Sequence, residues 1–139
     1  MPTYDEVEVG IALPPRTFPL QRVDLVRYCG ASGDYNVIHW NERVATAVGL
    51  PDVIAHGMLT MAVAARVVTD WTGDPGSLQS YRVRFSRPVV VPDDGAGAQL
   101  TVSGTVEDKL EDGTVVLALS ATVGDSKVLA GSRAVVRLA

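Results

Sequence analysis

The chain has 139 residues, of which 47% are hydrophobic and 20% charged, and its formal net charge is -4. This length predicts one domain, residues 1–139, and excludes two full domains. The composition is typical of a cytoplasmic protein and not of a nucleic-acid-binding one, so we expect no nucleic acid as a partner.

Neither a membrane span nor an exported leader is expected. The longest helical apolar stretch, residues 58–68, is interrupted by Arg66 and is too short to cross a bilayer. The first ten residues are acidic, whereas a secretory signal would be basic and then apolar. The single cysteine, Cys29, excludes an internal disulfide, and we interpret it as a small buried hydrophobic residue.

The first half of the chain carries mostly helical signals, after an early strand around residues 16–20. Apolar spacing predicts a helix over residues 22–31, which ends at the Gly33-Asp34 turn. Asn41 can cap a short helix that runs to Val48. A third helix, residues 57–71, is apolar or small nearly all round, with Arg66 and Asp70 as its only charges. Such a helix must be wrapped by other parts of the chain.

The second half carries strand signals. Residues 80–87 alternate Tyr81, Val83 and Phe85 with polar side chains, the period of a half-buried strand. Further strands are predicted over residues 100–107, 115–123 and 127–138, and Glu111-Asp112-Gly113 predicts a tight hairpin between the first two. The sequence therefore predicts an α+β fold of about five mostly antiparallel strands curled around one buried helix.

The stretch SGDYNVIHW, residues 32–40, is the first candidate site. Asp34 and His39 are five residues apart, which suits a loop that doubles back and aims both side chains at one point. Such an acid and base can move one proton off carbon and another onto a departing hydroxyl, as a β-elimination of water requires. Asn36 can hold either partner or a water through its amide. The alternative is an ordinary polar turn, with His39 packed beside Trp40.

The second candidate stretch is AHGMLT, residues 55–60. The exposed N–H groups at Gly57, at the positive end of the helix dipole, can receive a thioester oxygen as it gains negative charge. The alternative is that Gly57 only opens the helix. For His56 we favour packing and local hydrogen bonding. We expect no metal and no cofactor, because His39, His56, Asp34 and Asp52 have no recognisable zinc spacing.

With YCGASGDYNVIHW and IAHGMLTM in view, the chain resembles the MaoC-like hot-dog family of (R)-specific hydratases and dehydratases. It is most similar to the catalytic-subunit branch of the actinobacterial (3R)-hydroxyacyl-acyl-carrier-protein dehydratases of type II fatty-acid synthesis. Supporting blocks elsewhere extend the resemblance over almost the full length. Val37 departs from the pattern, because the family usually has proline there, and we expect retained activity with a looser loop.

The resemblance implies a hot-dog fold and a lyase that reversibly dehydrates (3R)-3-hydroxyacyl thioesters to trans-2-enoyl thioesters. It implies that Asp34 and His39 form the catalytic pair, that Asn36 supports them and that Gly57 supplies the oxyanion contact. In dehydration His39 would take the C2 proton while Asp34 helps protonate the leaving hydroxyl, although which residue handles which proton stays open.

The resemblance also implies a dimer, either with a second copy or with a related hot-dog subunit. The acyl group would be carried by an acidic carrier protein or by CoA. We therefore expect Arg82 and Arg84, which should share a strand face, and Arg87 to contact the phosphopantetheine phosphate or the carrier. The alternative is that these arginines are solvated strand positions.

Two other functions remain open. A hot-dog thioesterase would use the same fold, but it generally needs a carboxylate on the central helix, and this helix has none before Asp70. A non-catalytic acyl-binding subunit would be expected to lack the Asp34 and His39 pair.

Overall fold

The computed structural model describes residues 2–139 and contains the expected mixture of helices and strands. In chain order the elements are β1 (Ala12–Leu20), α1 (Arg22–Ser32), the 3₁₀ turn η1 (Val37–His39), α2 (Glu42–Ala47), α3 (Gly57–Thr72), the 3₁₀ turn η2 (Pro75–Ser77), β2 (Leu78–Phe85), β3 (Ala98–Lys109), β4 (Thr114–Val123) and β5 (Ser126–Arg137). The predicted α+β class, with three helices and five strands, is confirmed.

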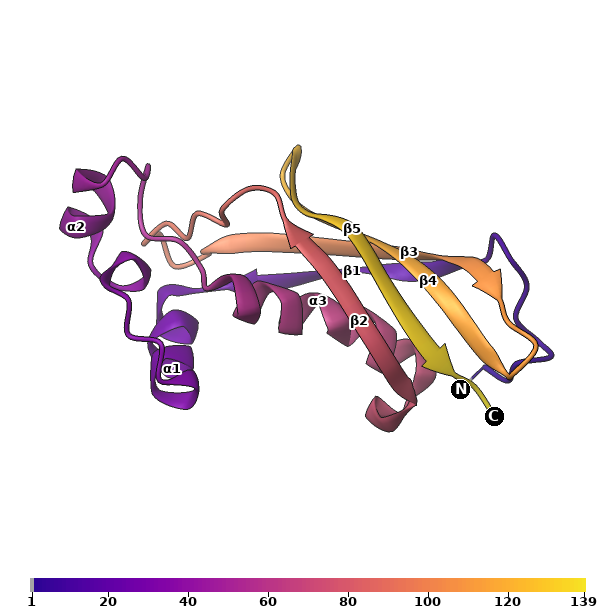
Figure 1. Ribbon diagram of the computed structural model, residues 1–139. Helices are drawn as coiled ribbons and strands as arrows, with labels where there is room; N and C mark the ends of the chain where they lie inside the picture. Colours follow the sequence, from indigo (N-terminus) through magenta and orange to yellow (C-terminus); the bar gives the residue numbers. More distant parts are fainter. Residues whose placement is uncertain (1) are drawn as a thin grey trace.

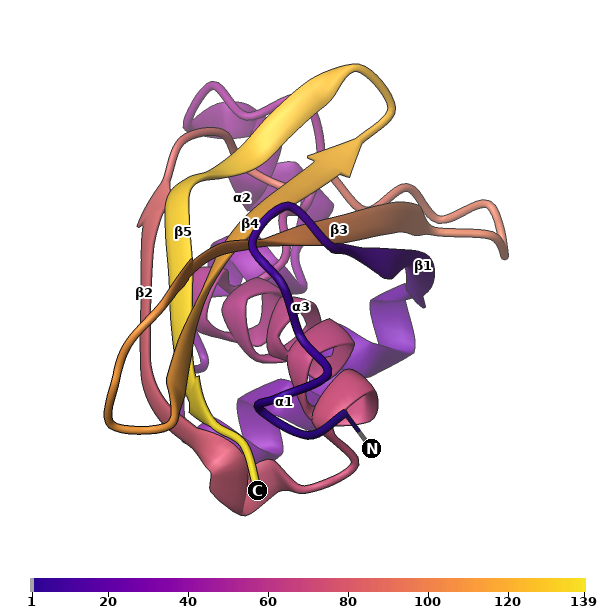
Figure 2. The same cartoon turned by 90° about the vertical axis from the view of Figure 1, so that its right-hand side faces the viewer.

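The strands form one antiparallel sheet in the order β1-β3-β4-β5-β2. The sheet curls around α3, as Figure 1 shows from the side and Figure 2 shows along the helix. Side chains of β3 alternate between buried and exposed, as the two-residue period predicts. Its buried side carries Leu100, Val102 and Val106, each at most 1% exposed, and this side faces the helix and forms the core.

The sheet covers only part of the helix surface. Ala64, Val67 and Val68 of α3 are buried in the core, whereas Met58 is 58% exposed and Ala62 is also exposed. The expectation that the whole apolar helix is wrapped is therefore wrong for one side, because a single sheet offers one face. An apolar part of α3 stays open to solvent in the isolated chain.

The two charged residues of α3 do not pair with each other. Asp70 forms an ion pair with Arg16 of β1, and the guanidinium of Arg66 lies 4.8 Å from the centre of the Phe18 ring. Both contacts join α3 to β1, so the two charged residues of the helix hold the edge strand β1 against it.

Strand β1 begins four residues earlier than predicted, at Ala12. The pairing register with β3 shifts between Leu13 and Arg16, at the Pro14-Pro15 step. Because β1 is an edge strand, prolines that cannot donate to a ladder are tolerated there.

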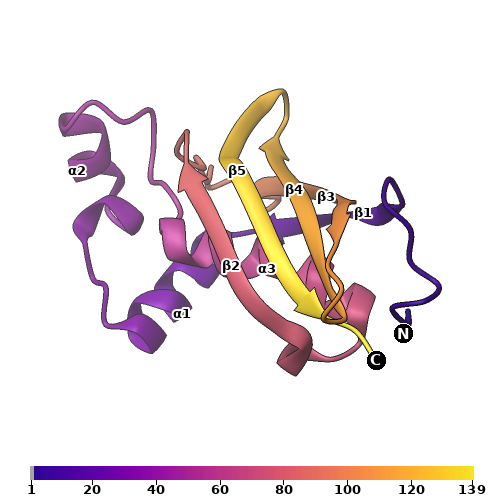
Figure 3. The same cartoon turned by 45° about the vertical axis from the view of Figure 1, so that its right-hand side comes forward.

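The segment that holds η1 and α2 projects beyond the end of the sheet, beside the first turn of α3 (Figures 1 and 3). The Arg22 guanidinium binds the Asp52 carboxylate at 2.7 Å and the Val91 carbonyl at 2.5 Å, which ties α1 to the segments before α3 and after β2. Both termini lie at the opposite end of the molecule, where the Tyr4 N–H donates to the Ala139 carbonyl. Within residues 2–139 we find no helix with the length and apolar character that a membrane crossing needs.

Candidate active site

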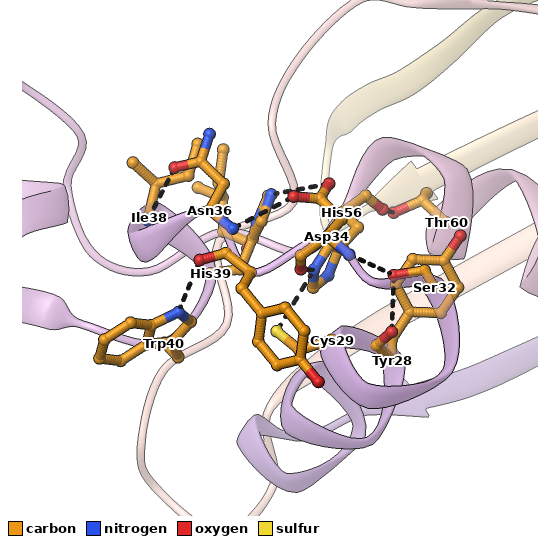
Figure 4. A network of polar contacts seen from close by, with 12 residues as sticks. Tyr28, Cys29, Ser32, Asp34, Asn36, Ile38, His39, Trp40, His56 and Thr60 are labelled. Atoms are coloured by element: carbon orange, nitrogen blue, oxygen red, sulfur yellow. Dashed lines mark hydrogen bonds and ion pairs between the residues drawn. The ribbon is translucent and has the colours of Figure 1, made fainter.

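The loop that carries Asp34 and His39 follows directly from the end of α1. Gly33 closes the helix in the left-handed conformation, with φ 75°, which glycine adopts without steric cost. The Ser32 hydroxyl then accepts the Asp34 N–H at 3.1 Å. These contacts turn the chain back within two residues and present Asp34 at the first turn of α3 (Figure 4).

One oxygen of Asp34 is used by the loop and the other faces the site. Asp34 Oδ1 accepts the Asn36 N–H at 3.1 Å, while Oδ2 lies 4.0 Å from His39 Nε2. This distance is too long for a direct hydrogen bond, so both groups keep a free position for a substrate or a water. The structure therefore brings together the two side chains that the sequence paired.

The imidazole of His39 is held by a long-range contact. Its Nδ1 lies 2.7 Å from the Ile54 carbonyl, which can only accept, so Nδ1 carries the hydrogen. In the neutral ring Nε2 then keeps its lone pair, and this atom faces Asp34. The His39 side chain is 8% exposed and that of Asp34 is 53% exposed, so the base is buried beside an accessible acid.

Asn36 supports the pair through the backbone and not by direct contact. Its side-chain oxygen accepts the Ile38 N–H at 3.3 Å and caps η1, the turn that carries His39. Among residues 2–139 no hydrogen bond joins the Asn36 side chain to either Asp34 or His39. The sequence predicted a supporting residue, and the geometry indicates that the support acts on the loop.

His56 packs below the pair, as expected, and Cys29 is buried next to it. The His56 ring stacks on His39 with the centroids 3.7 Å apart and the planes 23° apart. Its Nε2 lies 3.1 Å from the Asp34 carbonyl and 3.6 Å from Cys29 Sγ. Burial lowers the pKa of His56 below its usual value, so this imidazole stays neutral more readily than a free one.

Three side chains of this cluster could offer ligand atoms to a metal ion. Atoms of Asp34, His39 and His56 lie within 4.8 Å of one another. However, the two rings stack almost parallel, and His56 Nε2 already donates to the Asp34 carbonyl. His56 Nε2 therefore carries a hydrogen and offers no lone pair in this arrangement, so a metal would have to displace that hydrogen bond.

Gly57 begins α3 next to the pair. His56 makes no side-chain cap, and the N–H groups of Gly57 and Met58 have no acceptor within the described part of the chain. A Cβ added to Gly57 would lie 3.1 Å from Phe85 Cε1. The start of α3 therefore lies against the Phe85 ring, and its free N–H groups can bind a developing negative charge.

Two cavities meet at this point. One, of about 290 Å³, is lined by His39, Gly57 and Phe85; the other, of about 510 Å³, is lined by Asp34, His56, Gly57 and Phe85. Gly57 and Phe85 belong to both, so a ligand held at the start of α3 would meet His39 from one cavity and Asp34 from the other.

Phe85 was not predicted as a site residue. Its place in an alternating strand predicted a core position, yet it is 51% exposed, because β2 is the open edge of the sheet. No local signal in the sequence distinguishes this phenylalanine from Tyr81 or Val83 of the same strand.

The three predicted arginines lie in different surroundings. Arg87 lines the cavity of His39, whereas Arg82 and Arg84 are exposed and are absent from the lining of either cavity within residues 2–139. The register between β2 and β5 also shifts between Arg82 and Arg84. Only Arg87 is therefore brought to the site by the fold of this chain.

Comparison with known proteins agrees with this arrangement. The family described as MaoC like domain matches residues 9–124, most of the chain. The chain belongs to the MaoC-like family.

Individual MaoC-like relatives differ in length. The chain is 42% identical over 66 residues to 3-hydroxyacyl-thioester dehydratase X of Mycobacterium tuberculosis. The aligned stretch covers 48% of this chain and 22% of that protein. A solved MaoC-like dehydratase has a TM-score of 0.95 and 40% identity over 99% of this chain and 42% of its own. The unliganded R-hydratase PhaJ1 from Pseudomonas aeruginosa has a TM-score of 0.84 and 28% identity over 98% of this chain and 84% of its own. The chain thus spans less than half of the first two and most of the third.

Proposed function

We propose that this MaoC-like chain is a lyase that reversibly dehydrates (3R)-3-hydroxyacyl thioesters to trans-2-enoyl thioesters. The single observation that carries the proposal is the convergence of His39 Nε2 and Asp34 Oδ2, 4.0 Å apart, beside the free N–H groups of α3. The names of the relatives, a 3-hydroxyacyl-thioester dehydratase and an R-hydratase, support the same chemistry.

In the dehydration direction, the lone pair of His39 Nε2 takes the C2 proton and the electron pair moves toward the thioester carbonyl. The Gly57 N–H binds the oxygen that gains negative charge. Asp34 enters this step as the protonated carboxyl and gives its proton to the C3 hydroxyl, which leaves as water as the double bond closes. The proton now on His39 Nε2 then passes to the Asp34 carboxylate across the gap between them and restores both groups. In hydration the two side chains jointly hold the attacking water, which suits the gap between them.

The rival activities fit the geometry less well. Asp70, the first carboxylate of α3, lies 13 residues beyond Gly57 and is paired with Arg16. At 1.5 Å per residue it is about 20 Å away from the cavity mouth, too far to activate water for a thioesterase. A non-catalytic acyl-binding subunit would have no use for an aligned acid and base.

Hydration of crotonyl-CoA by the purified chain tests this function. We expect loss of the enoyl absorbance without release of free thiol, whereas thiol release would indicate a thioesterase. Asp34→Asn and His39→Ala are each expected to lower kcat at least about 100-fold, because each removes one of the proton transfers.

The matched control is Asp125→Asn, which removes a carboxylate from the exposed turn between β4 and β5. It should leave kcat within about twofold of the parent value. Near-parental turnover in both site variants, with circular dichroism showing folded protein, would overturn the assignment.

We further propose that Arg87, with Arg82 and Arg84 more peripheral, contacts the phosphopantetheine phosphate or an acidic carrier surface. Arg87 is the most direct candidate because it lines the cavity that holds the base. We expect Arg87→Glu to raise KM for a carrier-bound substrate about tenfold at unchanged kcat. Arg43→Glu, on the exposed surface of α2 and outside the described lining of both cavities, is the control for the change of charge. Equal KM values for both variants would exclude this role.

The proposed partner is a second hot-dog chain, either another copy or a related subunit. The open edge at β2 and the exposed apolar side of α3 support such a pairing. A cytoplasmic location is also proposed, since the free Cys29 suits a reducing compartment.

A further inference from the structure

His56 touches every part of the proposed catalytic set, although it is only 2% exposed. Its ring stacks on the base His39, its Nε2 meets the backbone carbonyl of the acid Asp34, and it is directly followed by Gly57. One side chain therefore contacts three segments that meet here: the end of α1, the turn η1 and the start of α3 (Figure 4).

The hydrogen bond to Asp34 fixes the tautomer of His56. A carbonyl oxygen only accepts, so Nε2 carries the hydrogen and Nδ1 keeps the lone pair. Nδ1 is buried without a hydrogen-bond partner among residues 2–139. A proton added there would create a buried charge with no acceptor, stacked on the His39 ring.

We propose that His56 is a positioning residue that fixes the acid, the base and the oxyanion contact relative to one another. This inference rests on the proposed dehydratase function. The Nε2–H holds the Asp34 backbone, so the carboxylate stays 4.0 Å from His39. The neutral ring face supports His39 when the base takes up a proton, because a cation is attracted to an aromatic face.

The surroundings of His56 favour the neutral ring. Tyr28 meets it edge to face with the centroids 4.7 Å apart, and the Cys29 thiol lies against Nε2. Asp34 and His39 are the other titratable groups in contact with it. Burial lowers the pKa of His56 more than the Asp34 carbonyl raises it. Burial therefore makes the neutral ring more favourable for His56 than for a free imidazole at the same pH.

Two substitutions separate the hydrogen bond from the ring. His56→Phe keeps a ring to stack on His39 but has no N–H for the Asp34 carbonyl. We expect kcat for crotonyl-CoA hydration to fall about 10- to 100-fold while KM changes less than about threefold, because a misplaced acid weakens only the transition state. His56→Gln offers an N–H at similar reach and is expected to recover kcat to within about fivefold of the parent.

Cys29→Ala is the matched control, because it removes a buried atom from the same side of His56 but keeps both contacts. It should be destabilising, yet leave kcat within about twofold. If His56→Phe has parental kcat, or if Cys29→Ala lowers kcat equally, His56 is only a packing residue and the inference fails.

Nitrogen-15 NMR of the parent protein gives an independent test, since the chain has only two histidines and the His56 variants assign both. We expect the neutral His56 ring to carry its hydrogen on Nε2 at a pH of about 8, where a free imidazole is neutral; a neutral ring with its hydrogen on Nδ1 would overturn the inference. This readout needs no turnover. A parent protein that hydrates no enoyl thioester would refute the proposed function, while the NMR result would still decide the state of His56.

Discussion

At the scale of single residues, Gly57 shows why a missing side chain can matter as much as a present one. Its φ is not positive, so glycine is not required there by the backbone. A Cβ at this position would stand 3.1 Å from Phe85 Cε1, a close contact that the half-exposed ring would relieve by a shift of a few tenths of an ångström. In the proposed mechanism the thioester oxygen binds beside the same residue.

We therefore predict that Gly57→Ala folds normally but has about 100-fold lower kcat/KM, because the oxygen is displaced from the N–H donors. Steady-state kinetics and a thermal melt check this. Gly30→Ala in α1 is the control, since its Cβ would meet nothing within 4 Å. It should add about 0.5–1 kcal/mol of stability without changing kcat/KM. Normal kinetics for Gly57→Ala would place the oxyanion elsewhere.

At the scale of elements, the turn η1 is built so that one residue can be proline. Val37 is its first residue, and its N–H donates to no acceptor in residues 2–139. Asn36 before it has φ -54° and ψ 126°, an extended conformation that a following proline allows. A proline φ near -65° also suits a 3₁₀ turn. The departure from the family pattern at Val37 thus leaves the turn compatible with proline.

We expect Val37→Pro to raise the free energy of unfolding by about 0.4–1 kcal/mol, because it restricts the unfolded chain and breaks no hydrogen bond. Urea denaturation measures this, and kcat should not fall. Ile38→Pro, one residue later, removes the N–H that Asn36 accepts and should destabilise the protein. A destabilising Val37→Pro would mean that the loop conformation differs from the one described.

At the scale of the whole molecule, several large apolar side chains of β2 and of the helices are exposed to solvent in the isolated chain. Strand β2 is an edge strand of the sheet, and its Phe85 is half exposed. Met58 of α3 is also exposed and lines the same cavity as Phe85. Helix α1 adds Val23 and Val26, and Val48 follows the end of α2; each of the three is at least 45% exposed. Apolar area of this kind is typical of a surface that another chain covers.

We predict that size-exclusion chromatography with light scattering gives twice the mass of the chain. The physical reason is the loss of water from the apolar side of α3 and from the β2 edge on pairing. A clean monomer at micromolar concentration would contradict self-pairing. In that case, recovery of hydratase activity on adding a related hot-dog subunit would identify a mixed pair.

Much of the fold and part of the site could be predicted from the sequence. Strand β3, helix α3, the Gly33 turn and the Asn41 cap could be predicted because each depends on residues within a few positions of one another. Pairing Asp34 with His39 needed only a short loop. Which of Phe85 and the three arginines line the site could not be predicted, because the local sequence of a strand does not indicate whether the strand lies at the edge of the sheet.

The sequence alone determined most of the elements, including the helix that begins at Gly57, and it predicted Asp34 and His39 as an acid and base pair. Only the tertiary structure decided the chemical state of the site. The Ile54 carbonyl selects the tautomer of His39, and the Asp34 carbonyl selects that of His56 from 22 residues away. The reason is physical: short-range spacing fixes periodicity and caps, whereas a buried hydrogen bond between distant residues exists only once the chain has closed around it.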